Sequence, residues 1–379
     1  MLLNPSFIFI FIWSGALMLY SLRYSYVLLD LSGLAFKYFI FSILSVLSSW
    51  LLCALFFGKF FPEINKHKNL YVAVSKKTIN TIRYISISVV ILFVFEVLYF
   101  KGTPFLSIIG VGANIIYSEF GIPSLHGFIS AMLLSLSMYS LYFYIKHKSK
   151  RYLFFYILTF LFPILSFSRG ALVSLIIQSV FVFLMFSNIS FGKFLRLFIF
   201  SIIFIILFGY LGEIRTSTSS DLYAPFLISD NYPDFMPNGF IWVYMYITTP
   251  LNNVGAVIEQ YEAVNFNFYG IFYGFLPSFI RDNLALPQTV NLVSSAFNVS
   301  SFMPNYLFSF GYYGSLIFYF LASFFSVFLY YRYALTSKLS YGFCLIVLLH
   351  STVLSIFSDF YFIQVYFFQF IIQFFVFRK

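Results

Sequence analysis

Charged residues are scarce in this sequence. Only 9% of its 379 residues are Asp, Glu, Lys or Arg, whereas a soluble domain carries about 25%. Hydrophobic residues make up 61% of the chain and aromatic residues 24%. The apolar runs reach membrane-spanning length and do not alternate with polar residues, which argues against strands. The scarcity of charge therefore predicts an all-α, polytopic integral membrane protein.

The motifs of nucleotide-dependent and metal-dependent enzymes are also missing. The chain has no P-loop, no HExxH motif and no two aspartates one residue apart, and GVGANI at 110–115 lacks the third glycine of a dinucleotide motif. Cys53 and Cys344 lie in separate apolar runs and offer neither metal spacing nor a disulfide framework. We therefore expect no metal and no cofactor, and a substrate that is already activated.

Ten spanning helices are predicted, because lipid-exposed backbone must satisfy its own hydrogen bonds. We expect the first to be retained, since it lacks the basic start and the cleavage site of a signal peptide. Seven helices fall within 1–211 and three within 306–379, and a long outer segment at 212–305 separates them. The expected spans are centred in 3–22, 34–57, 84–100, 125–145, 152–168, 171–187, 195–211, 306–331, 341–358 and 360–377.

The basic residues predict the orientation. In this topology 16 of the 22 Lys and Arg residues lie on one side of the membrane, with both termini. The positive-inside rule makes that side cytoplasmic. The net charge of +10 is thus a topology signal, and no nucleic-acid partner is expected. The six basic residues of the outer side are Arg23, Lys37, Lys101, Arg169, Arg215 and Arg281.

The outer segment 212–305 has a distinct composition. It holds seven of the twelve prolines and seven of the twelve acidic residues. Its aromatic content argues against disorder and, with its asparagines, suits carbohydrate, because rings stack on sugars and amides bond to hydroxyls. Residues 240–260, FIWVYMYITTPLNNVGAVIEQ, are apolar but interrupted by Pro250. We expect a re-entrant or interfacial helix there.

Three outer arginines are candidate phosphate ligands. Arg169 lies in the turn between the fifth and sixth spans, Arg215 follows the seventh span, and Arg281 lies late in the outer segment. A guanidinium forms two parallel charge-assisted bonds to phosphate and stays protonated, so the three together suit a pyrophosphate. The alternatives are headgroup anchoring for Arg169 and Arg215, and a salt bridge from Arg281 to Asp282.

Acidic residues of the outer segment are candidate general bases toward a sugar hydroxyl. In a helix Glu259 and Glu262 would share one face. The alternative for each is a solvated acidic surface. The acidic candidates are Glu213, Glu259, Glu262 and Asp282.

Single polar residues near the ends of other spans are weaker candidates. His126, at the outer end of the fourth span, is a candidate for substrate binding or as a base; the alternative is a hydrogen-bonded interfacial residue. Glu96 and Asp359 lie near outer helix ends, where a buried structural pair between them is considered. His350, in the middle of a span, is interpreted as a packing or polar-network residue.

The motifs around these residues resemble those of one known family. SRGAL at 168–172 resembles a motif of the O-antigen polymerases and ligases. GEIRTS at 212–217, followed by a long outer segment, is similar to the same proteins. PNYLFSFGYYGSL at 304–316 resembles their segment that leads back into the membrane.

The resemblance implies a GT-C-like glycosyltransferase at the periplasmic face of the bacterial inner membrane. An O-antigen polymerase transfers the growing glycan from undecaprenyl pyrophosphate to the non-reducing end of a new lipid-linked repeat unit, without metal, in lipopolysaccharide biosynthesis. Arg169 and Arg215, and more loosely Arg281, would stabilise the pyrophosphate leaving group. Asn305 and Tyr306, in the re-entry motif, would contact substrate. The implied partners are undecaprenyl-pyrophosphate-linked oligosaccharides, membrane lipid and a chain-length regulator protein.

Two other functions, and a purely structural role in the membrane, remain open at this point. A lipid-linked oligosaccharide flippase or transporter is expected to have inverted repeats and charges around a midplane cavity, and the sequence has no such symmetry. An O-antigen ligase is expected to carry a histidine just before the re-entry segment, where this chain has Met303, Pro304 and Asn305. That departure favours the polymerase and leaves the general base unassigned.

Overall fold

The computed structural model is helical throughout the residues that it describes, apart from one isolated antiparallel bridge between Ser25 and Ile228. The prediction of an all-α fold is confirmed for this part of the chain. The described residues are 3–64, 74–116, 119–187, 192, 195–196, 199, 227–236, 239–260, 269–281, 283–284, 290, 292 and 299–377.

Five helices are long and apolar enough to cross a membrane: α2, α3, α5, α8 and α13. Helices α1, α14 and α15 are apolar but shorter. These lengths and compositions are those of a helical membrane protein. The helices are α1 (Pro5–Ser21), α2 (Gly33–Phe57), α3 (Lys76–Phe100), α4 (Pro104–Ile108), α5 (Leu125–His147), α6 (Lys150–Leu158), α7 (Leu161–Leu165), α8 (Arg169–Phe186), α10 (Gly239–Gln260), α11 (Tyr269–Phe272), the 3-10 helix η3 (Tyr273–Phe275), α12 (Ser278–Arg281), α13 (Met303–Thr336), α14 (Leu339–Leu354) and α15 (Gln364–Val376).

The expected span at 152–168 is divided into the short helices α6 and α7. The division falls just before Pro163, which has no N–H and whose ring clashes with the carbonyl one turn earlier. The Thr159 hydroxyl, just after α6, donates a hydrogen bond to the Tyr156 carbonyl at 2.6 Å. The expected span at 195–211 lies almost entirely outside the described residues.

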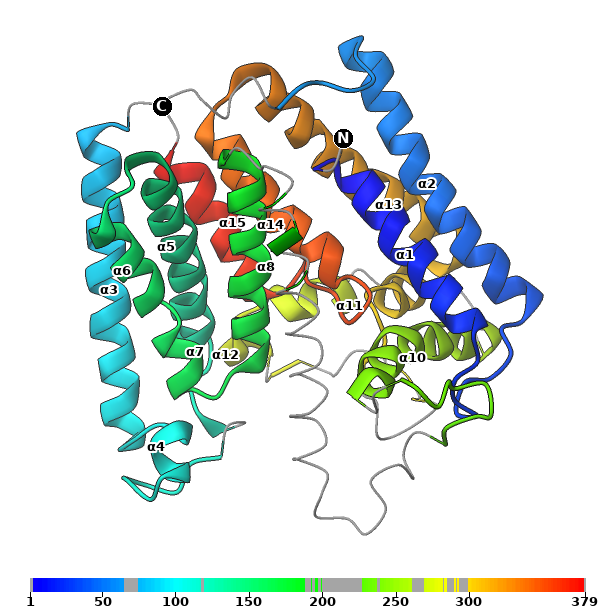
Figure 1. The fold of residues 1–379 in the computed structure, drawn as a ribbon, viewed down its shortest axis with the longest axis horizontal. Helices are drawn as coiled ribbons and strands as arrows, with labels where there is room; N and C mark the ends of the chain where they lie inside the picture. The colour runs from blue at the N-terminus through cyan, green and yellow to red at the C-terminus, as the bar shows by residue number, and fades with distance from the viewer. Residues whose placement is uncertain are drawn as a thin grey trace.

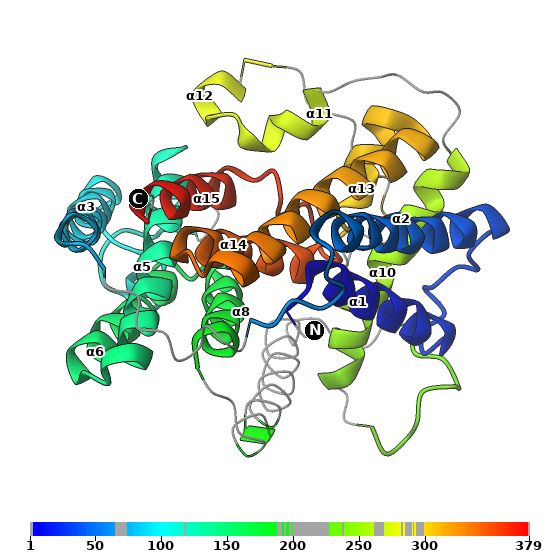
Figure 2. The same ribbon diagram turned by 90° about the horizontal axis from the view of Figure 1, so that it is seen from above.

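Two hydrophobic clusters make up the core, and α13 runs through both (Figures 1 and 2). One cluster joins α1, α2 and α10 to the first part of α13 around Trp13, Tyr38 and Met245. The other joins α5, α8, α14 and α15 to the second part of α13. Helix α13 therefore connects the two halves of the molecule.

A break at Gly311 divides α13. Its backbone has φ 71° and ψ −174°, a combination open to glycine and closed to residues with a Cβ. The turns before the break pack back on the helix after it, and the ring of Tyr306 stacks on that of Phe318 at 4.4 Å. The break thus buries Tyr306 inside the protein.

Helix α10 is present where the outer segment was expected to form a helix, and it lies across the lower end of α1 in Figure 1. Asn252 holds it against the link between α1 and α2. The Asn252 side chain accepts from the Leu29 N–H at 3.0 Å and the Tyr20 hydroxyl at 2.9 Å, and donates to the Val27 carbonyl at 3.2 Å.

Several helix connections fall into two groups at opposite edges of the molecule. In Figure 1 the last turns of α2 and α5 and the link from α13 to α14 lie at the upper edge. The links α1–α2 and α7–α8 lie at the lower edge, here called the outer end, and the α14–α15 link lies between the two edges, beside α11. This alternation agrees with the expected topology, while the orientation of the outer end toward the periplasm stays a prediction.

Candidate functional site

The α7–α8 turn is a tight connection at the outer end. Phe167 adopts φ 56°, a left-handed conformation that costs a residue with a side chain about 1–3 kcal/mol. The N–H of Ser168 then bonds to the Pro163 carbonyl at 2.9 Å. Ser168 caps α8, because its Oγ accepts from the Ala171 N–H at 3.4 Å. This turn makes Arg169 the first residue of α8.

Arg169 is exposed, and no described residue forms an ion pair or a hydrogen bond with its guanidinium. The first N–H groups of a helix lack intrahelical partners and attract anions. Gly170, beside it, has helical backbone, and a Cβ built there would meet nothing within 4 Å. Packing within the described protein therefore does not require this glycine, and the open space suits the approach of an anionic ligand.

A buried carboxylate lies at the same end of the molecule. Glu96, at the end of α3, is fully buried, and its Oε1 accepts from the Ile122 N–H at 3.0 Å. Its Oε2 lies 2.9 Å from Nδ1 of His126, in the first turn of α5. The ring of His126 stacks on Phe162 of α7 at 5.4 Å. Glu96 and His126 therefore join α3, α5 and α7.

The expectation that Glu96 and Asp359 form a buried pair is wrong. Glu96 bonds to His126, whereas Asp359 accepts from the Tyr306 hydroxyl at 2.8 Å. Glu96 lies in the last turns of α3 and Asp359 lies in the α14–α15 link, so each carboxylate bonds to a donor in its own surroundings.

Asp359 is the centre of a second buried cluster. Its Oδ1 accepts from the N–H groups of Tyr361 at 3.0 Å and Phe362 at 3.4 Å, and these bonds shape the α14–α15 link. Desolvation by burial raises the pKa of Asp359 to about 6, although hydrogen bonds from Tyr306 and from the backbone lower it. Tyr306, expected to bind substrate, instead uses its hydroxyl within the protein.

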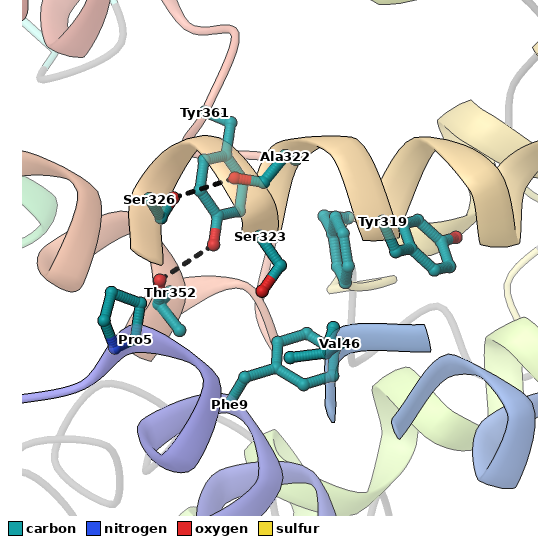
Figure 3. A pocket seen from close by; sticks show the side chains of 10 residues that line it. Pro5, Phe9, Val46, Tyr319, Ala322, Ser323, Ser326, Thr352 and Tyr361 are labelled. Atoms are coloured by element: carbon teal, nitrogen blue, oxygen red, sulfur yellow. Dashed lines mark hydrogen bonds between the residues drawn. The ribbon is translucent and has the colours of Figure 1, made fainter. Parts of the chain in front are cut away.

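A small cavity lies between α1, α13 and α14 (Figure 3). Phe9, Tyr319 and Ser323 are among its lining residues, and on one side the hydroxyl groups of Thr352 and Tyr361 bond to each other at 2.8 Å. Its volume of about 20 Å³ accommodates one water molecule. The cavity is too small for a sugar ring, so it is not a glycan-binding site.

Arg281 lies apart from Arg169. It ends α12, where its guanidinium sits 5.6 Å from the ring centre of Tyr273. The adjoining η3 packs on the α14–α15 link, with Phe275 stacked on Phe362 at 5.7 Å. Figure 2 shows α12 and α8 on opposite sides of α15. The described residues thus do not bring these two arginines together.

The remaining predicted site residues do not gather around Arg169 in the described part of the chain. Asn305, near the start of α13, is exposed and its side chain hydrogen-bonds to Asp359, and Glu259 is exposed near the end of α10. Arg215, Glu213 and Glu262 lie outside the described residues, as does Asp282, so neither the three-arginine hypothesis nor the Arg281–Asp282 alternative is tested.

Polar side chains also pair inside the bundle. Gln178 of α8 and Gln369 of α15 exchange amide hydrogen bonds at 2.9 and 2.7 Å. Ser174 bonds to the hydroxyl of Tyr366 at 2.8 Å. His350 is buried 4.6 Å from the Tyr366 ring, and neither of its ring nitrogens bonds to a described residue. Its surroundings agree with the packing interpretation.

Sequence reasoning missed the partnership of Glu96 with His126. The two residues are 30 positions apart and belong to different helices. The only signal was that each was expected near the outer end of its span. No protein-family model, curated protein or solved structure matches this chain.

Proposed function

We propose that this protein is a membrane glycosyltransferase that polymerises lipid-linked oligosaccharide repeat units, as an O-antigen polymerase does. The donor is the growing glycan on undecaprenyl pyrophosphate, and the acceptor is the non-reducing end of a new lipid-linked repeat unit. The reaction takes place at the periplasmic face of the bacterial inner membrane. This proposal combines the motif resemblance with the chemistry available at the outer end.

The observation that carries the proposal is the position of Arg169. It is an exposed cation at the first position of α8, at the outer end, and no described atom lies within 4 Å of a Cβ built at Gly170 beside it. A pyrophosphate leaves readily when its developing charge is stabilised, and both a guanidinium and a helix N-terminus do this. Arg215 and Arg281 remain candidates to assist from the outer segment.

The transfer requires three events at the reacting carbon. The acceptor hydroxyl loses its proton to a base, and its oxygen attacks the anomeric carbon of the donor. The bond from that carbon to the pyrophosphate oxygen breaks, and the electron pair leaves with the pyrophosphate. Arg169 acts on the last event, because negative charge grows there in the transition state.

The proposal is tested by replacing Arg169→Ala in the source strain. We expect surface lipopolysaccharide with a single repeat unit in place of a ladder, because losing one such charge contact costs about 10²–10³ in rate. Lys37→Ala is the matched control, since Lys37 is another exposed cation near the outer end. Immunoblots of the membrane fraction establish equal protein levels.

Two outcomes contradict the proposal in different ways. An unchanged ladder in Arg169→Ala removes the role of Arg169. A ladder that survives deletion of the whole gene removes the polymerase function. If deletion leaves the lipopolysaccharide core without any repeat unit, a flippase or a ligase is the better explanation.

A further inference from the structure

His126 is held by contacts on several sides. The carboxylate of Glu96 binds Nδ1, the Phe162 ring stacks on the imidazole, and Gly121 lies against the Cβ–Nδ1 side of the ring. Gly121 has φ 111°, and a Cβ there would lie 2.6 Å from Cγ of His126, so only glycine fits. The ring is thus confined to one orientation although 27% of the side chain is exposed.

The hydrogen bond to Glu96 determines which ring nitrogen is available. A carboxylate accepts, so Nδ1 of His126 carries the proton. In a neutral imidazole the lone pair then resides on Nε2. No described residue hydrogen-bonds to Nε2. A buried carboxylate that orients a partly exposed histidine in this way is the arrangement of a general base.

Helix α7 links the pair to the α7–α8 turn. Phe162, which contacts His126, is part of α7. The next residue, Pro163, accepts the N–H of Ser168 and so shapes the turn that presents Arg169. Helix α7 therefore contacts the candidate base and leads directly into the turn that holds the candidate leaving-group cation.

We propose that His126 is the general base of the glycosyl transfer and that Glu96 is its positioning residue; this inference rests on the proposed function. Nε2 of His126 accepts the proton of the acceptor sugar hydroxyl. The freed oxygen forms a bond to the anomeric carbon while the carbon–pyrophosphate bond breaks and its electron pair leaves with the pyrophosphate. Glu96 stabilises the imidazolium, which then releases its proton to water.

The variant Glu96→Gln distinguishes a role of Glu96 in positioning the general base from a purely structural contact between α3 and α5. The Ile122 N–H keeps the amide oxygen on its own side, so the amide NH₂ faces Nδ1 of His126. Both hydrogen bonds survive, but Nδ1 must now accept, and the proton moves to Nε2. A structural role predicts full activity, whereas the base role predicts a large loss.

His126→Asn provides the second, independent variant. The asparagine amide occupies the place of Nδ1 and still donates to Glu96, while Nε2 is deleted. The matched controls are Glu119→Gln, an exposed acid of the same outer region, and His147→Asn, at the other end of α5.

The assay uses the purified full-length protein and lipid-linked repeat units extracted from a strain that lacks the gene. We expect kcat to fall about 10²–10⁴-fold in both variants, with the thermal unfolding midpoint and KM close to wild type, and wild-type kcat in both controls. Wild-type kcat in either variant overturns the base role. A raised KM with unchanged kcat also overturns it, in favour of substrate binding alone. If the wild-type protein makes no polymer in this assay and gene deletion leaves the cellular ladder intact, it is the proposed function that fails.

Discussion

The hydroxyl of Tyr306 donates a 2.8 Å hydrogen bond to Oδ2 of Asp359 and so ties the start of α13 to the α14–α15 link. Both side chains are buried. Tyr306→Phe removes the donor and leaves a buried carboxylate oxygen with one partner fewer, which costs about 1–3 kcal/mol. We expect a lower thermal unfolding midpoint in detergent. Tyr313→Phe is the control, because Tyr313 is exposed on the same helix; equal midpoints for the two variants would contradict the prediction.

Stability should depend on pH through Asp359. Its folded-state pKa of about 6 lies above its ordinary value of 3.8. The protonated form is therefore favoured by folding, and this stabilisation is full below about pH 3.8 and is lost as pH rises through about 6. At about 1.4 kcal/mol per pKa unit, the loss amounts to about 3 kcal/mol.

Asp359→Asn isolates that dependence, because asparagine stays neutral. We expect the unfolding midpoint of the variant to rise relative to wild type as the pH increases from about 4 to about 6. A difference between the two proteins that stays constant over this range would show that burial does not raise the pKa of Asp359.

Gly170→Ala tests whether a ligand approaches the start of α8. Alanine meets no described atom within 4 Å there and is about 0.5–1 kcal/mol better than glycine inside a helix. The fold should keep or gain stability, while polymer formation should fall because the methyl group obstructs the phosphate. Gly15→Ala in α1 also meets no atom of the described residues within 4 Å and should leave activity unchanged. Full activity in Gly170→Ala would show that nothing needs this space.

The Gln178–Gln369 pair should contribute to the packing of α8 on α15. Gln178→Leu leaves the buried amide of Gln369 without its partner. We expect a destabilisation of about 0.6–2 kcal/mol, the usual range for interhelical hydrogen bonds in membranes. The double variant with Gln369→Leu should recover part of the loss. Additive effects in this double-mutant cycle would indicate that the two amides do not interact.

Asn252 should be essential for the docking of α10. Asn252→Leu removes three hydrogen bonds and leaves the Leu29 N–H without an acceptor. We expect faster proteolysis within the outer segment and a lower unfolding midpoint, by about 1–3 kcal/mol per unpaired buried group. Asn231→Ala, at an exposed position of the same segment, is the control. A proteolysis rate equal to that of the control would mean that apolar packing alone holds α10.

Local features of the chain were predictable because their causes are local. Continuous apolar runs predicted helices, and Pro250 was recognised inside a helix that forms where expected. Pro163 interrupts the expected span at 152–168, and the short helices α6 and α7 form there instead of one continuous helix. A proline acts on its own helical turn, so such signals can be read without knowing the fold.

The sequence by itself determined the helical membrane character of the protein and made Arg169 a candidate, because composition and motif spacing act along the chain. Only the tertiary structure decided that Glu96 bonds to His126 and that Tyr306 bonds to Asp359. Such partners lie on different helices and links, and which of them meet depends on how the helices rotate and cross when they pack. A single sequence does not state these rotations, so the pairing of Glu96 with Asp359 was as plausible from the chain as the pairing with His126.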